Sequence, residues 1–205
     1  MKTKNFLLNG ALLIVALFSV NGVMAETPVD HTKYNGNRVS TDAVTVNIKF
    51  TAIQSIQVNP NQNTINFEYN TPDHYTNGLV AEEKTQTKTD HLTVYHSGPF
   101  NVKVKSSGFL NGTEVLEGTD HVKVLASIGA NSNIKEDAGL GFHEVSLAAN
   151  ATGTEFITSQ KGGMGYTFDV QYDHSGDHYK DYINNNYKSE DKTYTATVTY
   201  EISSN

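Results

Sequence analysis

The strictest alternation of apolar and polar side chains lies at the end of the chain, over residues 193–202 (TYTATVTYEI). Because successive side chains of a β-strand point to opposite faces, this period of two predicts a strand with one buried face. Its β-branched and aromatic residues favour the same conformation. The predicted buried face consists of Tyr194, Ala196, Val198, Tyr200 and Ile202.

A second strong alternation covers residues 43–50 (AVTVNIKF). The pattern slips by one residue near Ile53 and resumes at Ile56, which predicts a bulge or a bend between the two parts. The apolar face of the first part consists of Val44, Val46, Ile48 and Phe50.

Shorter alternating segments follow at close intervals, with turn residues between them. No segment shows a convincing helical period, although the polar connection 70–89 has room for one helical turn over 79–84. We therefore predict an all-β protein, a single Ig-like antiparallel β-sandwich of about nine strands. The remaining predicted strands are 64–69, 91–95, 100–105, 122–128, 142–148, 155–158 and 165–172, and Asn111-Gly112 predicts a hairpin turn.

The first 25 residues have the pattern of a secretory signal peptide. Lys2 and Lys4 precede an apolar run over 6–20, and Val23-Met24-Ala25 fits a signal-peptidase site. Residues 26–42 are polar and predict a flexible leader, so the sandwich domain is expected over 43–205. We expect an exported protein, with no membrane span after cleavage because no second apolar run is long enough.

Charge and cysteine content exclude several classes of function. The chain has 22 acidic and 15 basic residues, and loss of Lys2 and Lys4 leaves a formal charge of −9. Such a surface does not suit phosphate backbones, so nucleic acid is not an expected partner. The chain has no cysteine, which excludes disulfides, thiolate catalysis and cysteine-ligated metals.

The histidines do not predict a metal site or an active site. His174 and His178 are four residues apart, but Gly176 between them argues against a shared helical face. The acidic spacing of the same loop lacks the glycine and the distal ligand of a calcium loop. Since no nucleophile motif is present either, we expect a non-enzymatic protein without a cofactor.

Tyrosines of the polar loop 173–191 have two interpretations. Tyr179, Tyr182 and Tyr187 could pack locally, or they could stack on sugars or line an interface. The second interpretation supports an alternative function, a self-contained periplasmic or cell-surface sandwich that binds glycan or cell wall.

These patterns together resemble the fimbrial (pilin) subunits of the alternate chaperone–usher class, such as the common pilus and colonisation-factor fimbriae. Residues 43–50 followed by 56–59 look like the donor strand of that family running into its first sheet strand. Residues 65–69, 92–95 and 100–105 are similar in order and spacing to its next three strands, and 194–202 to its closing strand.

The resemblance implies a structural subunit of a bacterial surface fibre that assembles by donor-strand exchange and serves cell adhesion. The N-terminal strand of one subunit would complete the sandwich of the next, with Val44, Val46, Ile48 and Phe50 as the side chains that fill its pockets. The implied partners are identical or related subunits and a periplasmic chaperone, in the periplasm, cell surface or fimbrium of a Gram-negative bacterium. The alternative is that 43–50 forms the first strand of its own sandwich. The leader 26–42 is a departure, because the family places its donor strand at the mature N-terminus.

Overall fold

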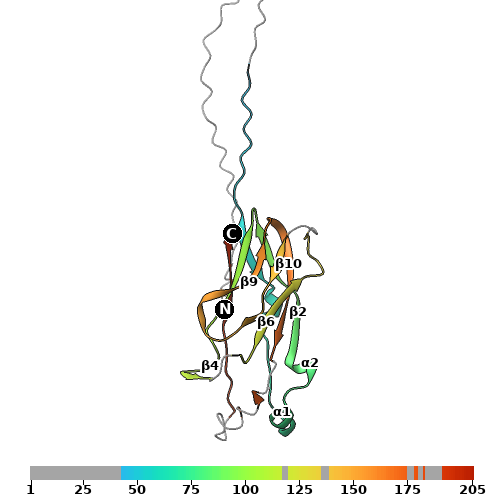
Figure 1. Cartoon of the computed structure of the whole chain (residues 1–205), viewed down its shortest axis with the longest axis vertical. Coiled ribbons are helices and arrows are strands. Elements are labelled where there is room, and N and C mark those ends of the chain that lie inside the picture. Colours follow the sequence, from blue (N-terminus) through green and yellow to red (C-terminus); the bar gives the residue numbers. More distant parts are fainter. Residues whose placement is uncertain (1–42, 117–119, 135–138, 175–177, 180–181, 183–190) are drawn as a thin grey trace, which may run out of the picture. The chain divides into compact units, whose positions relative to one another are not determined.

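The computed structural model describes residues 43–116, 120–134, 139–174, 178–179, 182 and 191–205 (Figure 1). The described residues from Ile48 to Asn205 belong to one compact unit, and those before Ile48 belong to another. The predicted signal peptide (1–25) and leader (26–42) lie outside the described residues.

The described part of the chain contains eleven β-strands and three short helices. The helices are the 3-10 helix η1 (Pro60–Gln62), α1 (Pro72–Asn77) and α2 (Ala81–Lys84). The first strands are β1 (Gln54–Val58), β2 (Thr85–His96), β3 (Phe100–Ser106), β4 (Leu110–Asn111), β5 (Glu114–Val115) and β6 (Lys123–Ile128). The others are β7 (Leu140–Phe142), β8 (Val145–Ser146), β9 (Asn150–Ser159), β10 (Gly163–Asp173) and β11 (Val198–Ser204).

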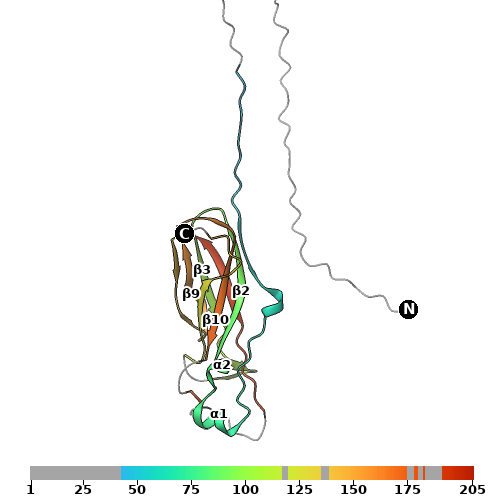
Figure 2. The same ribbon diagram turned by 90° about the vertical axis from the view of Figure 1, so that its right-hand side faces the viewer.

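The strands form two main antiparallel sheets that face each other, so the predicted all-β sandwich class is confirmed. One sheet has the order β1-β2-β10-β6-β8 and the other has the order β11-β3-β9-β7, while β4 and β5 make a small separate hairpin. Figure 2 shows α1 and α2 at one end of the sandwich and the C-terminus at the other.

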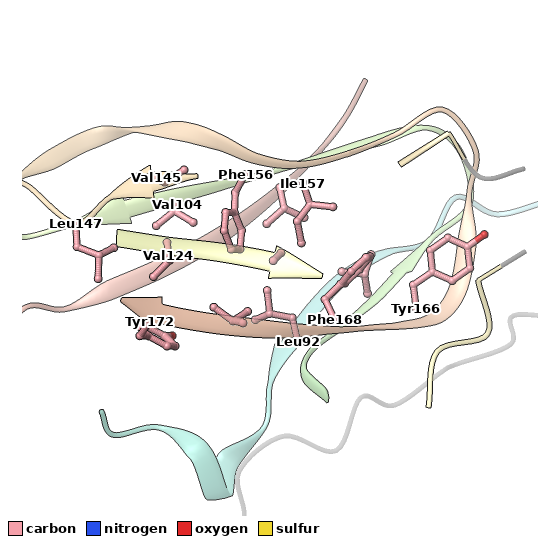
Figure 3. Close-up of a cluster of buried hydrophobic side chains, with 14 of the residues drawn as sticks. Leu92, Val104, Val124, Val145, Leu147, Phe156, Ile157, Tyr166, Phe168 and Tyr172 are labelled. Carbon is pink, nitrogen blue, oxygen red and sulfur yellow. The ribbon is translucent and has the colours of Figure 1, made fainter. Parts of the chain in front are cut away.

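Aromatic and branched side chains from the inner faces of both sheets meet in one core (Figure 3). Phe156 comes from β9 and Phe168 from β10, and both are fully buried. Closely packed side chains of this kind supply most of the stability of a chain without disulfides. Other fully buried members are Leu92, Val94, Phe100, Val102, Val124, Ile157 and Val170.

Several strand predictions are confirmed, and the differences come from pairing. The predicted strands 100–105, 122–128 and 165–172 correspond to β3, β6 and β10. The Asn111-Gly112 turn joins β4 to β5, with Gly112 at a φ of 61° that favours glycine. The strand predicted over 155–158 is longer in the structure, because β9 starts at Asn150, which pairs with Ser106 of β3.

A bulge in β2 holds a partly exposed polar network on the outer face of its sheet. Val170 pairs with Lys88 and Phe168 pairs with Leu92, so three residues of β2 lie opposite the single residue between them in β10. Asp90, in the middle of this bulge, has a φ of 47°. Its carboxylate accepts a hydrogen bond from the Thr167 hydroxyl (2.8 Å), which holds the pKa of Asp90 below its usual value.

Gly129→Ala is expected to destabilise the protein by about 1–3 kcal/mol. A Cβ at this position would lie 2.3 Å from an Asp90 carboxylate oxygen and 2.8 Å from the Thr167 hydroxyl oxygen. The bulge network would have to move apart to accept it. Thermal or urea unfolding measures the loss.

Gly98→Ala is the matched control, because a Cβ at Gly98 meets no atom within 4 Å. We expect its unfolding free energy to stay within about 0.5 kcal/mol of the wild type. Equal losses of unfolding free energy in Gly129→Ala and Gly98→Ala would contradict a stabilising role for the network at the β2 bulge.

Candidate functional site

The segment before β1 displays apolar side chains to solvent. Residues 43–53 lie in no strand or helix, so the strand expected over 43–50 is not formed in this chain. The four alternating apolar side chains are 87%, 80%, 77% and 90% exposed, in the order Val44, Val46, Ile48 and Phe50. A run of large apolar side chains left in water is the usual sign of a surface that another molecule covers.

Among the strands that the structure describes, none pairs with the outer edge of the C-terminal strand β11. It pairs with β3 and lies at the end of the sheet order. The main-chain groups of alternate residues in an antiparallel strand point to the same side. The Thr197 carbonyl accepts from Ser107 on the β3 side, so the main-chain groups of Val198, Tyr200 and Ile202 point to the unpaired edge.

A side-chain hydrogen bond shows which element faces this edge. The Gln54 amide of β1 donates to the Ile202 carbonyl oxygen at 2.9 Å. Strand β1 is itself the edge of the opposite sheet. The edge strands of the two sheets therefore lie beside each other without a shared main-chain ladder.

Residues 63–70 continue this side of the sandwich beyond η1. They keep the alternating burial of a strand, with Ile65, Phe67 and Tyr69 half-buried and their neighbours exposed. The strand predicted over 64–69 is nevertheless not formed, and the Asn66 carbonyl is bonded by the side chain of Gln86 instead (2.5 Å). Residues 63–70 therefore have the apolar face of a strand, but no described strand pairs with them.

We call β1, residues 63–70 and the unpaired edge of β11 the open flank. Its inner-face side chains pack on the core but remain partly exposed, and Val58 is still 41% exposed. Inner-face residues of the central strands β2, β3 and β10 are buried. The half-buried apolar side chains of the open flank are Ile56, Ile65, Phe67, Val198, Tyr200 and Ile202.

A hydrogen-bonded chain of rings lies beneath the open flank. The His91 ring lies 3.1 Å through Nε2 from the Tyr172 hydroxyl, which lies 2.7 Å from the Tyr200 hydroxyl. Burial raises the pKa of both phenols, so both stay protonated in the physiological range. Sequence reasoning missed this connection, because a local pattern does not show that three distant rings meet.

The loop tyrosines pack against a second group of rings near α1. The Tyr182 ring stacks on His174 and its hydroxyl lies 2.9 Å from His121 Nδ1. Burial, with Tyr75 and Tyr179 nearby, raises the pKa of Tyr69 in the same group to about 12. Tyr179 lies against Gly78. This arrangement favours local packing for Tyr179 and Tyr182, whereas Tyr187 lies outside the described residues.

Tyr182→Phe is expected to lower the unfolding free energy by about 0.5–1.5 kcal/mol, because it removes the hydroxyl from His121. Tyr95→Phe in β2 is the control, and we expect it to be nearly neutral. Thermal unfolding of both variants measures the difference. A Tyr182→Phe variant as stable as the wild type would contradict local packing through this hydroxyl and would favour the other interpretation, in which Tyr182 stacks on sugars or lines an interface.

The described residues contain no group of three histidines and carboxylates that could hold a metal ion. Residues 175–177 of the loop between His174 and His178 lie outside the described residues. A polar cleft of about 310 Å³ lies between 66–70 and α2, and neither Tyr179 nor Tyr182 lines it. Its lining residues are Asn66, Glu68, Asn70, Glu82, Glu83 and Gln86.

Comparison with protein-family profiles gives no match. Comparison with curated proteins gives no significant match either. Over the described residues, no helix has the length and apolar character needed to cross a membrane.

Proposed function

We propose that the protein is a non-enzymatic structural subunit of a bacterial surface fibre that assembles by donor-strand exchange. The observation that carries the proposal is the segment 43–50, which presents four alternating apolar side chains to solvent and pairs with none of the described strands. A strand that is amphipathic but unpaired is suited to complete a sheet of another molecule.

The open flank has the main-chain groups and the apolar side chains that a donor strand would bind. The unpaired edge of β11 offers main-chain donors and acceptors, and β1 with 63–70 offers a second wall of apolar side chains. Eight residues of donor strand extend about 26 Å, close to the length of about 23 Å of the seven residues of β11. The two surfaces therefore match in chemistry, in period and in length.

The proposed occupant of the open flank is residues 43–50 of a second copy of this chain or of a related subunit. Side chains at Val44, Val46, Ile48 and Phe50 would enter the core side of the flank, and Thr45, Asn47 and Lys49 would face water. Before assembly, a periplasmic chaperone would cover the same apolar surface. The fibre is proposed to lie at the cell surface of a Gram-negative bacterium.

The experiment compares three versions of the protein by size-exclusion chromatography and negative-stain microscopy. They are the mature chain, a chain that starts at Ala43 and a chain that starts at Gln54. The second cut removes only the leader. The third removes the donor segment and keeps β1, which pairs with β2.

We expect fibres from the first two versions and a soluble monomer from the third. Fibres from all three would contradict the role of 43–50. A stable monomer from the mature chain, at concentrations where subunits of this kind polymerise, would contradict the fibre itself.

A further inference from the structure

The ring of His91 is a buried titratable group that is connected to the open flank by hydrogen bonds. It is 2% exposed, although its neighbour Asp90 sits in the bulge of β2. Its Nδ1 lies 3.2 Å from the Gln62 side-chain oxygen and its Nε2 lies 3.1 Å from the Tyr172 hydroxyl. Through Tyr172, the ring is connected to Tyr200 of β11.

The hydrogen bonds around His91 define its protonation. The Gln62 amide nitrogen donates to the Thr89 carbonyl at 2.9 Å, so the Gln62 oxygen faces the histidine as an acceptor. His91 must then carry its proton on Nδ1 and accept from the Tyr172 hydroxyl at Nε2. Every polar atom in this network is satisfied when the ring is neutral.

The surroundings of His91 oppose a second proton. Burial, followed by the positive charge of Lys88, lowers the pKa of His91 to about 4. The groups that face the ring from the other elements are uncharged: Gln62 from η1, Tyr172 from β10 and Tyr200 from β11. A charged ring would donate from Nε2, so the Tyr172 hydroxyl would have to turn and donate to Tyr200, whose own proton would lose its acceptor. These contacts offer no carboxylate in compensation.

We propose that His91 is an acid-sensitive lock on the edge strand β11. Neutral His91 ties Tyr200 of β11 to β10 and β2, which belong to the opposite sheet. Protonation disrupts this hydrogen-bonded chain. Of the three strands that it joins, β11 is the most easily released, because β11 pairs with one described strand whereas β2 and β10 each pair with two. If the proposed function holds, acid also weakens the surface that receives the donor strand, so assembly requires neutral pH.

The direction in which stability changes with pH follows from the difference between the folded and unfolded pKa values of His91. A histidine whose folded pKa lies below its unfolded pKa of 6.5 stabilises the fold fully above pH 6.5, and this contribution is lost as the pH falls toward 4. Between pH 7.5 and pH 4.5, the unfolding equilibrium constant is expected to rise by up to about 70-fold through His91 alone. Burial also lowers the pKa of His174, which adds a change of the same sign.

The test uses the mature chain and two variants. His91→Gln is neutral at every pH, and His143→Gln removes a half-exposed histidine as a control. Urea unfolding at pH 7.5 and 4.5 gives the pH-dependent loss of stability. We expect most of this loss to disappear in His91→Gln and to persist in His143→Gln. Equal losses in all three proteins would overturn the lock.

Two measurements on the wild type decide the matter if His91→Gln fails to fold. Titration by NMR should place the pKa of His91 well below 6, and a value near 6.5 would overturn the proposal. Amide protection in β11 should fall between pH 7.5 and pH 5 before that of β9 does. Simultaneous loss of protection in both strands would also overturn it.

Fibre assembly at pH 7.5 and pH 5 separates the lock from the proposed function. Fibres that form only at pH 7.5 support both. A protein that forms no fibre at either pH contradicts the proposed function, while its unfolding and titration data still decide the lock. Equal assembly at both values contradicts the coupling between lock and assembly.

Discussion

An Ile48→Asp variant is expected to be exported and folded but to form no fibres. Ile48 lies outside every strand and is 77% exposed, so its replacement removes no packing within the chain. In a fibre, the same position would lose about 1.5–3 kcal/mol of apolar burial and would place a carboxylate in an apolar pocket at a cost of several kcal/mol more. The sum corresponds to at least about a thousandfold weaker association.

Asn47→Asp is the matched control. It adds the same charge at the residue before Ile48, on the opposite face of the segment. We expect this variant to polymerise like the wild type. Circular dichroism and unfolding should show both variants as stable as the parent. Normal fibres from Ile48→Asp, or their loss in both variants, would show that the apolar face of 43–50 is not what enters the neighbouring subunit.

A chain that carries a second copy of residues 43–53 after Asn205, joined by a short glycine-containing turn, is expected to be monomeric and more stable. Strand β11 ends at Ser204, so a tight turn brings the added strand back along its unpaired edge. Burial of four apolar side chains contributes about 1.5–3 kcal/mol each, against about 1–2 kcal/mol per ordered residue. These two terms roughly cancel, so the net gain of a few kcal/mol comes from the main-chain hydrogen bonds to β11, at about 0.5–1.5 kcal/mol each. A gain of this size raises the melting temperature by about 10 °C.

The control for this variant is the same extension with aspartate at the two added positions that correspond to Val46 and Ile48. It should melt like the parent chain and should still form fibres, because its open flank remains available. Calorimetry measures the melting temperature, and size-exclusion chromatography measures whether the protein assembles. An extension that leaves polymerisation and melting temperature unchanged would contradict the assignment of the open flank as the acceptor.

The faces of the strands could be predicted from the sequence, because side-chain alternation is a local property. In β10 the predicted inner residues Tyr166, Phe168, Val170 and Tyr172 are all buried. The short helix predicted near 79–84 is present as α2, while α1 was missed. Its start is marked by Thr71, whose hydroxyl accepts from the His74 amide, and by Pro72 at the first turn.

Pairing could not be predicted in the same way. Residues 43–50 and 64–69 alternate as strands do, yet neither belongs to a sheet of the described residues. A strand requires main-chain hydrogen bonds to a neighbour, and the local pattern does not reveal whether a neighbour is available. The same limit applies to residues 193–197, which alternate in burial but join the sheet only from Val198.

The all-β class, the inward faces of the strands and the candidate donor residues could be predicted from the sequence, since each depends on spacing along the chain. The open flank, and the meeting of His91, Tyr172 and Tyr200 beneath it, became apparent only in the folded structure. These features join residues up to 109 positions apart, from His91 to Tyr200, in two different sheets. They depend on how the sheets pack, because contacts between distant side chains follow from the arrangement of the whole core rather than from any one segment.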